Sequence, residues 1–289
     1  MTSIAIAIAV ASYGTGAKTP LDTILWRDML PHLVKATLPE IRGGKYRYHV
    51  YIGYDNGDPV YDAPHAAALF GRAFRTMLAK VGVPNGSNSS FQLHMMAISD
   101  CRHAPSWVVS RLMQTAYDNG AQYMLQLNDD SMLLTEGWSH LLVTALRKHR
   151  HGVQTNLLGA PLFGVSGPED FTYGRPTLLT HSFAHRTHIT IHGHWFHPEF
   201  RNWFSDNWFS EVYGKNATTI FSGVKVRHMV TRQELRYAPD EKAGGDMLAY
   251  TLQQGQATTK RFLAFIDTHK KKAGYDAKPE HKAATKAQR

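Results

Sequence analysis

Residues 123–134 read YMLQLNDDSMLL, an apolar run of strand length that is interrupted by Asn128-Asp129-Asp130. Burying an ionised carboxylate without a partner costs several kcal/mol, so this strand end must open into water or bind a cation. Oxygen ligands of this kind suit a hard divalent ion such as Mg2+ or Mn2+. Asp and Ser are also favoured at helix N-termini, so the stretch alone fits equally well as the cap of a helix that begins near Thr135.

Strand-like and helix-like segments alternate before and after this stretch, which predicts an α/β domain with a mostly parallel central sheet flanked by helices. The predicted strands cover residues 4–12, 46–54, 91–98 and 122–127. The predicted helices cover residues 21–37, 66–81, 106–118 and 137–149. A further strand is expected at residues 156–163, followed by a loop rich in Gly and Pro at 164–176.

The composition indicates a folded globular protein. An apolar fraction of 43%, with 13 Phe, 13 Tyr and 6 Trp, excludes a disordered chain. The single cysteine, Cys101, excludes an intramolecular disulfide framework and is expected to be a packing residue in a reducing compartment. The apolar run at residues 4–10 follows no Lys or Arg and is too short to span a bilayer, so we expect a soluble cytoplasmic protein.

Much of the formal net charge of +9 lies near the end of the sequence, where His269-Lys270-Lys271-Lys272 begins a run of basic residues. This composition predicts a basic flexible tail at residues 267–289. The folded part carries no zinc-finger or RNA-binding motif, so nucleic acid is not the expected partner.

Polar residues lie at the ends of three of the predicted strands: Ser12 ends the first and Tyr13 follows it, Asp55 follows the second, and Asn128-Asp129-Asp130 follow the fourth. In open parallel sheets, ligands bind beyond the carboxyl ends of the strands, so these residues should share one rim. There Tyr13 could stack on a base and Asp55 could accept hydrogen bonds from a base or ribose. The loop after strand one, Tyr13-Gly14-Thr15-Gly16, is neither a dinucleotide fingerprint nor a P-loop.

Residues 180–214 are the densest polar and aromatic region, with six histidines between His181 and His197. The spacing of His181, His185 and His188 would fit one face of a helix in a histidine-only zinc site. Thr and Ile at 187–191 favour extended structure instead, and no cysteine is available as a partner.

With these features the chain resembles nucleotide-sugar-dependent glycosyltransferases of the GT-A fold, in which a DxD-type motif ends a strand and holds Mn2+ or Mg2+ on the donor diphosphate. Asn128-Asp129-Asp130 stands in the DxD place, with Asn replacing the first acid. Residues 183–213 are similar to a stretch of algal, protist and large-DNA-virus members, including HRTH at 185–188, FRNW at 200–203 and SDNW at 205–208. The resemblance covers residues 4–228.

The resemblance implies a single catalytic domain at residues 1–266, with a nucleotide-sugar half at 1–134 and an acceptor half at 156–266. It implies a nucleotide-diphosphate sugar as donor, with UDP among the nucleotides expected, and a glycan or glycoconjugate as acceptor. A viral member would act in the host cytoplasm.

The resemblance also implies roles for individual residues. Asp130 is the expected metal ligand, Asp129 a less favoured one, and His228 at the end of VKVRH (224–228) the last ligand, unless it is an ordinary strand-end residue. Asn128 is expected to hydrogen-bond ribose. The candidates for binding phosphate are Arg186, Arg201, Lys225 and Arg227, and those for lining the sugar or acceptor pocket are His185, His188, Trp203 and Trp208.

Transfer also needs a base that deprotonates the acceptor hydroxyl, and Asp206 is our candidate because surrounding aromatic residues would raise the pKa of its carboxyl. An Asp base predicts inversion at the anomeric carbon. Asp206 also fits as the cap of a helix at 207–213.

Two other functions fit part of the pattern. A sugar-phosphate nucleotidyltransferase would want a Gly-rich basic loop after strand one, where only Lys18 is basic. A non-catalytic carbohydrate-binding or nucleic-acid-binding protein would give no common function to Asp129, Asp130, Asp206 and His228.

Overall fold

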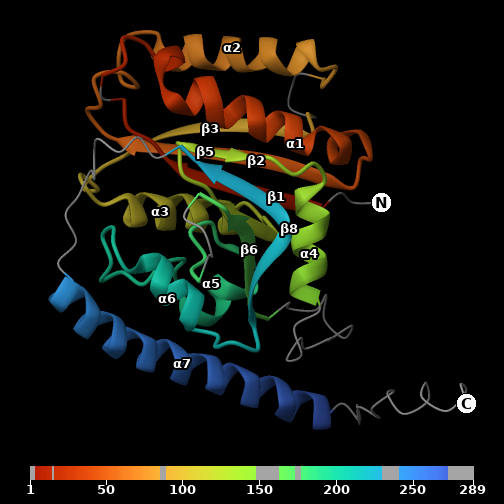
Figure 1. Ribbon diagram of the computed structural model, residues 1–289, viewed down its shortest axis with the longest axis vertical. Helices are drawn as coiled ribbons and strands as arrows, with labels where there is room; N and C mark the ends of the chain where they lie inside the picture. Colours follow the sequence, from red (N-terminus) through yellow and green to blue (C-terminus); the bar gives the residue numbers. More distant parts are fainter. Residues whose placement is uncertain are drawn as a thin grey trace, which may run out of the picture.

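One eight-stranded sheet runs through the computed structural model, with strand order β3-β2-β1-β4-β7-β6-β8-β5 (Figure 1). The structure describes residues 4–14, 16–84, 89–147, 163–172, 177–229 and 241–272. In the last of these ranges, side chains are described only for residues 244–268. The strands are β1 Ile4–Ala11, β2 Tyr46–Asp55, β3 Phe91–Ile98, β4 Tyr123–Gln126, β5 Ser131–Leu133, β6 Val165–Asp170, β7 Phe183–His185 and β8 Thr218–His228. Strands β1 to β4 pair in parallel, whereas β7 is antiparallel to β4 and β6, and β5 is antiparallel to β8.

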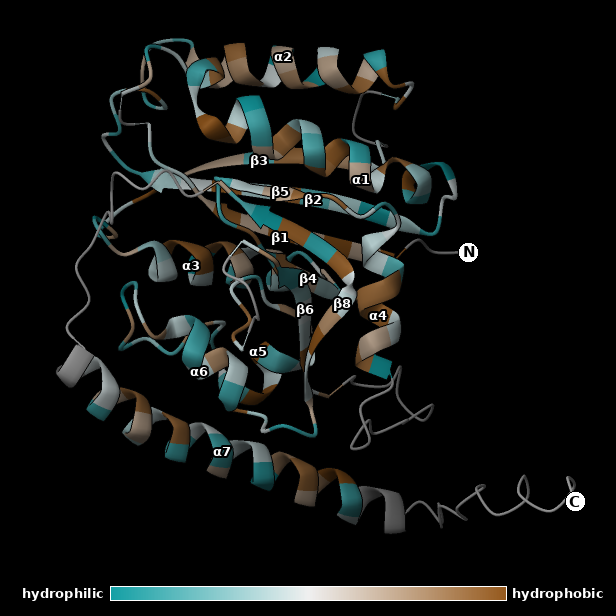
Figure 2. Ribbon diagram, viewed as in Figure 1, coloured by the Kyte–Doolittle hydropathy of each residue, from teal (hydrophilic) through white to brown (hydrophobic). Residues whose placement is uncertain are grey.

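Helices cover both faces of this sheet (Figure 1). The helices are α1 Leu30–Arg42, α2 Ala66–Lys80, α3 Pro105–Asp118, α4 Trp138–Arg147, α5 Thr187–His192, α6 Ser205–Glu211 and α7 Glu241–Lys272; a 3-10 turn, Pro20–Asp22, and a π-helical turn, Leu25–Met29, precede α1. Helices α1 and α2 lie on one face, and α3, α5 and α6 lie on the other. Helix α7 runs across α5 and α6, and hydrophilic and hydrophobic residues alternate along it, as expected of an amphipathic helix with one covered face (Figure 2).

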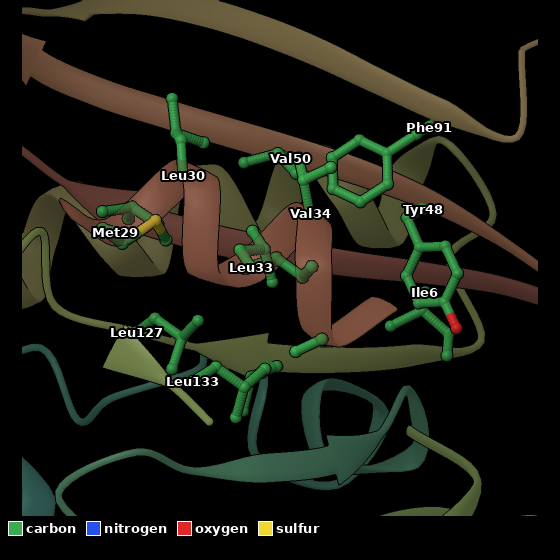
Figure 3. Close-up of a cluster of buried hydrophobic side chains, with 14 of the residues drawn as sticks. Ile6, Met29, Leu30, Leu33, Val34, Tyr48, Val50, Phe91, Leu127 and Leu133 are labelled. Atoms are coloured by element: carbon green, nitrogen blue, oxygen red, sulfur yellow. The ribbon is translucent and has the colours of Figure 1, made fainter. Parts of the chain in front are cut away.

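The alternation along β1 explains the two layers. Ile6 and Ile8 belong to the core beneath α1 and α2, whereas Ala7 and Ala9 belong to the core beneath α3. Figure 3 shows Ile6 in the first core together with Leu33 of α1 and Val50 of β2.

Small residues on the sheet face beneath α3 let this helix lie close to the sheet. A Cβ atom at Gly53 of β2 would lie 2.5 Å from Val108 Cγ1 and 3.0 Å from Leu112 Cδ1, so glycine is required where α3 crosses β2.

The structure confirms the predicted fold class, a single α/β domain with a mostly parallel sheet, and the first four strands lie where the sequence places them. The helix predicted at 137–149 is α4, and its last two positions lie outside the described residues. The strand predicted at 156–163 also lies outside the described residues, except for Phe163.

Two predictions in the second half were wrong. Residues 165–170 form β6 instead of a loop, because Pro168 lies at a register shift of the β6–β8 pair, where a missing N–H is tolerated. Gly167 permits a close backbone approach, since a Cβ there would lie 2.3 Å from His181 O. Residues 187–192 form α5 instead of extended structure, because packing against α7 overrides the β propensity of Thr and Ile.

Helix α7 continues to Lys272, past position 267 where the sequence predicts a flexible tail to begin, and residues 273–289 lie outside the described ranges. None of the described helices has both the length and the apolar character needed to cross a membrane.

Candidate functional site

A surface pocket lies at the carboxyl ends of β1 and β2 and is closed by the loop between β3 and α3. Ser12 and Tyr13 line it from β1, Asp55 from β2, and Arg102 and His103 from the loop. The ring of Tyr13 is 45% exposed. Burial raises the pKa of the half-buried Asp55 carboxyl, although the neighbouring His103 and Arg102 oppose the rise. The pocket thus offers an aromatic face, a carboxylate and a guanidinium together.

The position of Tyr13 is set by Asp58 in the loop after β2. The buried Asp58 carboxylate accepts hydrogen bonds from the N–H groups of Gly14 (2.9 Å), Val60 (2.8 Å) and Tyr61 (2.9 Å). A Cβ at Gly14 would lie 2.4 Å from Val60 Cβ, so only glycine permits this approach. The turn residues therefore tie the end of β1 to the end of β2.

Arg102 and His103 were not among the predicted site residues, although the polar run SDCRH at 99–103 directly follows β3. The loop is held in a strained shape, since His103 has a left-handed φ of 58°. Arg201 stacks on Trp107 at 4.7 Å and donates to Arg102 O at 3.3 Å. Arg201, a phosphate candidate from the sequence, thus supports this loop.

The two acids of the turn between β4 and β5 lie in different surroundings. Asp129 is 3% exposed, and its Oδ2 accepts a hydrogen bond from Ser12 Oγ at 3.0 Å. Ser12 Oγ also lies 2.8 Å from the hydroxyl of Tyr61. Asp129 is therefore a buried link between the end of β4 and the end of β1. The side chain of Asp130, in contrast, is 23% exposed.

His228 lies beside Asp130, as expected from the sequence. Strand β8 pairs antiparallel with β5 so that His228 lies opposite Ser131, and Met229 N donates to Asp130 O at 2.7 Å. His228 Nε2 is 2.9 Å from Asp130 Oδ1 and 3.3 Å from Asn128 Nδ2. The side-chain oxygen of Asn128, Oδ1, in turn accepts a hydrogen bond from Gln126 Nε2 at 2.7 Å.

Two further residues belong to this cluster: Asp170, which was not predicted, and His181, which was predicted only as part of a histidine-only zinc site. His228 Nδ1 is 3.4 Å from Asp170 Oδ2, which is 3.9 Å from His181 Nε2. Potential ligand atoms of Asp170, His181 and His228 all lie within 4.8 Å of one another, and this is the one such group among the described residues. Asp170 was missed because residues 164–176 were predicted to form a loop, and His181 was considered only together with His185 and His188.

The two carboxylates of the cluster attract positive charge, which can be a proton on His228 or a bound cation that displaces that proton. Burial would lower the pKa of His228, but the carboxylates of Asp130 and Asp170 outweigh it and raise that pKa to about 9. Burial would raise the pKa of Asp170, but hydrogen bonds from His228 and Thr172 lower it to about 2. His181, fully buried, stays neutral because burial lowers its pKa to about 4. Carboxylate oxygen and imidazole nitrogen are ligands that Mn2+ and related divalent ions accept.

Asp206 lies in the first turn of α6, next to the segment that carries His181. Burial raises the pKa of its carboxyl, against the effect of the Asn207 N–H, which donates to it at 3.0 Å. One turn later, Ser210 Oγ donates to Asp206 O (2.7 Å) and accepts from Leu179 N (2.9 Å). Leu179 precedes His181 by two residues, so these bonds anchor α6 to that segment.

Of the four predicted pocket aromatic and histidine residues, His188 and Trp208 lie in the core. His188 is 1% exposed, with ring nitrogens 3.0 Å from the Tyr213 hydroxyl and 2.8 Å from Trp195 O. Trp208 is fully buried and donates to Thr251 O at 3.3 Å. Neither can line a pocket, whereas Trp203, just before α6, is 40% exposed.

His185 and Arg186 lie at the opposite end of the sheet from the acidic turn, because β7 is antiparallel to β4 and His185 pairs with Tyr123. Arg186 stacks on Tyr117 at 4.3 Å and donates to Tyr117 O at 3.3 Å, so its role is to hold the end of α3. The expected contacts of His185 with sugar and of Arg186 with phosphate do not fit this position.

Lys225 forms an ion pair with Glu169. Side chains alternate along a strand, so Lys225 and His228, three positions apart in β8, point to opposite faces. The histidine-only zinc alternative also fails, since no three of the histidines described here meet the mutual distance found for Asp170, His181 and His228.

No protein-family model matches the chain, and no curated protein matches it. Among solved structures it is similar to S. aureus TarS, with 11% identity, a TM-score of 0.49 and coverage of 80% of this chain but 37% of TarS. A putative nucleotide-diphospho-sugar transferase from Desulfovibrio desulfuricans has 12% identity, a TM-score of 0.33 and 65% coverage of either chain. A 4-diphosphocytidyl-2C-methyl-D-erythritol synthase from Anaerococcus prevotii has 10% identity, a TM-score of 0.42 and coverage of 86% of this chain and 99% of its own. These similarities are too distant to assign an activity.

Proposed function

We propose that this chain is a metal-dependent glycosyltransferase that moves a sugar from a nucleotide-diphosphate sugar to a hydroxyl of a glycan or glycoconjugate, with inversion. The observation that carries the proposal is the Ser12–Asp129 hydrogen bond of 3.0 Å, which joins the pocket at the end of β1 to the turn that bears Asp130. The pocket proposed for the nucleoside therefore adjoins the residues proposed for the cation, as binding of a nucleoside diphosphate would require.

The pocket supplies the groups that a nucleoside needs. The exposed ring of Tyr13 offers a stacking face, and Asp55 can accept from base or ribose donors. Arg102 and His103 lie in the same pocket, where a guanidinium can donate to a base carbonyl or a phosphate. Asn128, whose Nδ2 lies 3.3 Å from His228 Nε2, remains our candidate for a ribose contact.

Asp130 and His228 would hold Mn2+ or Mg2+ at the exposed side of the cluster. The side chain of Asp130 is 23% exposed and that of His228 14%, whereas those of Asp170 and His181 are 2% and 0% exposed. A diphosphate can therefore reach Asp130 more easily than the buried pair. When bound, the ion supplies positive charge that stabilises the leaving nucleoside diphosphate.

Asp206 would take the proton from the acceptor hydroxyl. Its raised pKa suits a general base better than an ordinary Asp carboxylate. Trp203, three residues earlier, offers an exposed aromatic face on which an acceptor sugar can stack. A carboxylate that activates the acceptor on the face opposite the leaving group leads to inversion.

The test is a panel of nucleotide sugars with Mn2+ in which released nucleoside diphosphate is measured, because donor hydrolysis needs no known acceptor. We expect release with at least one donor, and strong loss in Asp130→Asn. Glu136→Gln, which changes an exposed acid six residues away, is the control and should leave release unchanged. A panel without release, or equal rates in Asp130→Asn and wild type, would refute the proposal.

The sugar-phosphate nucleotidyltransferase is separated in the same experiment. It would release pyrophosphate from a nucleoside triphosphate and a sugar phosphate, and would leave the nucleotide sugars intact. The described part of the loop after β1 contains one basic residue, Lys18, for the triphosphate that this reaction uses.

A further inference from the structure

We propose that Asp170 is a positioning residue that orients the imidazole of His228, so that Nε2 faces the cation and Nδ1 keeps its proton. The inference rests on the proposed function, because it takes Asp130 and His228 as the cation ligands. Opposite edges of the ring face the two acids: Nε2 is 2.9 Å from Asp130 Oδ1, and Nδ1 is 3.4 Å from Asp170 Oδ2. Histidines that bind metals commonly donate their other N–H to a carboxylate, which fixes the tautomer and the ring orientation.

The surroundings of Asp170 suit a supporting acid better than a ligand that meets substrate. Its side chain is 2% exposed. Oδ1 accepts from Thr172 N at 3.0 Å, and Oδ2 accepts from Thr180 Oγ at 3.4 Å. Donors of the protein therefore already use both oxygens, and an ion that entered between Asp170 and His181 would be buried away from a diphosphate.

The backbone holds Asp170 and His228 at a fixed separation. Asp170 pairs with Val226 in the parallel β6–β8 ladder. Beyond the pair, Thr172 Oγ accepts from His228 N at 2.8 Å and donates to His228 O at 3.3 Å. The two strand ends are thus bonded at Val226 and at His228, which limits the movement of the His228 backbone relative to the Asp170 carboxylate.

His181 closes the far side of Asp170. Its ring is fully buried, with Nε2 3.9 Å from Asp170 Oδ2 and 3.2 Å from Ser131 Oγ. Ser131 pairs with His228 across the β5–β8 ladder. His181, in the segment before β7, therefore contacts both Asp170 and the strand that pairs with His228. A change at Asp170 should therefore act through the His228 ring.

The first test is the affinity of the full chain for Mn2+ alone, measured from the EPR signal of free Mn2+. We expect Asp170→Asn to weaken binding by about 10-fold to 100-fold, the usual effect of removing such a partner. Glu169→Gln, the neighbouring acid in β6 that pairs with Lys225, is the matched control and should bind like wild type. Wild-type affinity in Asp170→Asn, alongside weakened binding in Asp130→Asn and His228→Gln, would overturn the inference and leave the proposed function standing.

If Asp130→Asn and His228→Gln also bind Mn2+ like wild type, the proposed metal site itself fails. If His181→Gln and Asp170→Asn each abolish binding while Asp130→Asn does not, the ion is bound directly by Asp170, His181 and His228, and the positioning role is refuted.

A second measurement needs no variant, so it is unaffected by any folding defect in Asp170→Asn. The nitrogen-15 NMR spectrum of the wild-type chain with Mg2+, a diamagnetic ion, should show His228 protonated at Nδ1 and not at Nε2. A proton at Nε2 with none at Nδ1 would overturn the inference, and a His228 signal unchanged by Mg2+ would contradict the proposed cation ligand.

Discussion

Substitution of Gly244 by Ala in α7 should destabilise the protein through Phe204, the residue before α6. A Cβ at Gly244 would lie 2.1 Å from Phe204 Cε2, 2.4 Å from Cδ2 and 2.8 Å from Cζ. Phe204 itself has a left-handed φ of 69°, which is unfavourable for a bulky residue, so a shift of this ring adds to a position that is already strained. Asp206 follows two residues later, in the first turn of α6.

The neighbouring Gly245 provides a matched control, since a Cβ there meets no atom within 4 Å. Both alanines gain the same helix propensity of about 1 kcal/mol, so the difference between the variants isolates the packing cost. Overpacking of this kind costs about 1–3 kcal/mol, so Gly244→Ala should be less stable than Gly245→Ala by about that amount.

Urea unfolding of the two variants measures this difference. We expect a lower midpoint for Gly244→Ala with an unchanged slope, and in a transfer assay a lower kcat with unchanged donor binding, because α6 carries the proposed base. Equal unfolding midpoints for the two variants would refute the contact between α7 and Phe204 as the support of α6.

Three further predictions concern the second half of the chain. Burial lowers the pKa of His192 to about 3, so between pH 6.5 and 3 the unfolded chain binds more protons than the folded chain. Stability should therefore fall as the pH falls through this window, by up to about 1.4 kcal/mol per pH unit for this group, and urea unfolding of His192→Phe should show a smaller slope with pH. An unchanged slope would contradict the buried neutral ring. Trp208→Ala should cost about 3–5 kcal/mol in urea unfolding, because the ring is fully buried. Trp203→Ala should change the free energy of unfolding by no more than about 0.5 kcal/mol and should raise the KM for the acceptor. If Trp203→Ala is less stable than Trp208→Ala, the placement of Trp203 at the surface and of Trp208 in the core is refuted. Asp206→Asn should lower kcat for transfer with unchanged donor affinity, and wild-type kcat would exclude it as the base.

The first half of the fold could be predicted because its pattern is local. The alternation of Ile and Ala in β1 shows a strand buried on both faces, and polar residues directly after the strands mark the rim that holds Tyr13, Asp55 and Asp130. His228 could be matched to Asp130 only through the family resemblance, and the structure places their side chains 2.9 Å apart.

The second half was harder because strand direction and bulges are not local properties. Gly167 and Pro168 are typical of turns, and only pairing with β7 and β8 makes them part of a strand that ends at Asp170. Arg186 was predicted to bind phosphate, but the antiparallel direction of β7 places it at the far end of the sheet. For Trp208, its spacing along a helix could not distinguish a residue that lines a pocket from a core residue beneath α7.

The most direct test of the proposed site is a crystal structure of the chain grown with Mn2+ and UDP or GDP, with the ion located by its anomalous scattering. We expect one Mn2+ within bonding distance of Asp130 Oδ1 and His228 Nε2, in contact with the diphosphate, and the nucleobase beside Tyr13. An ion bound between Asp170 and His181, or a nucleotide bound away from the β1 and β2 strand ends, would contradict this expectation.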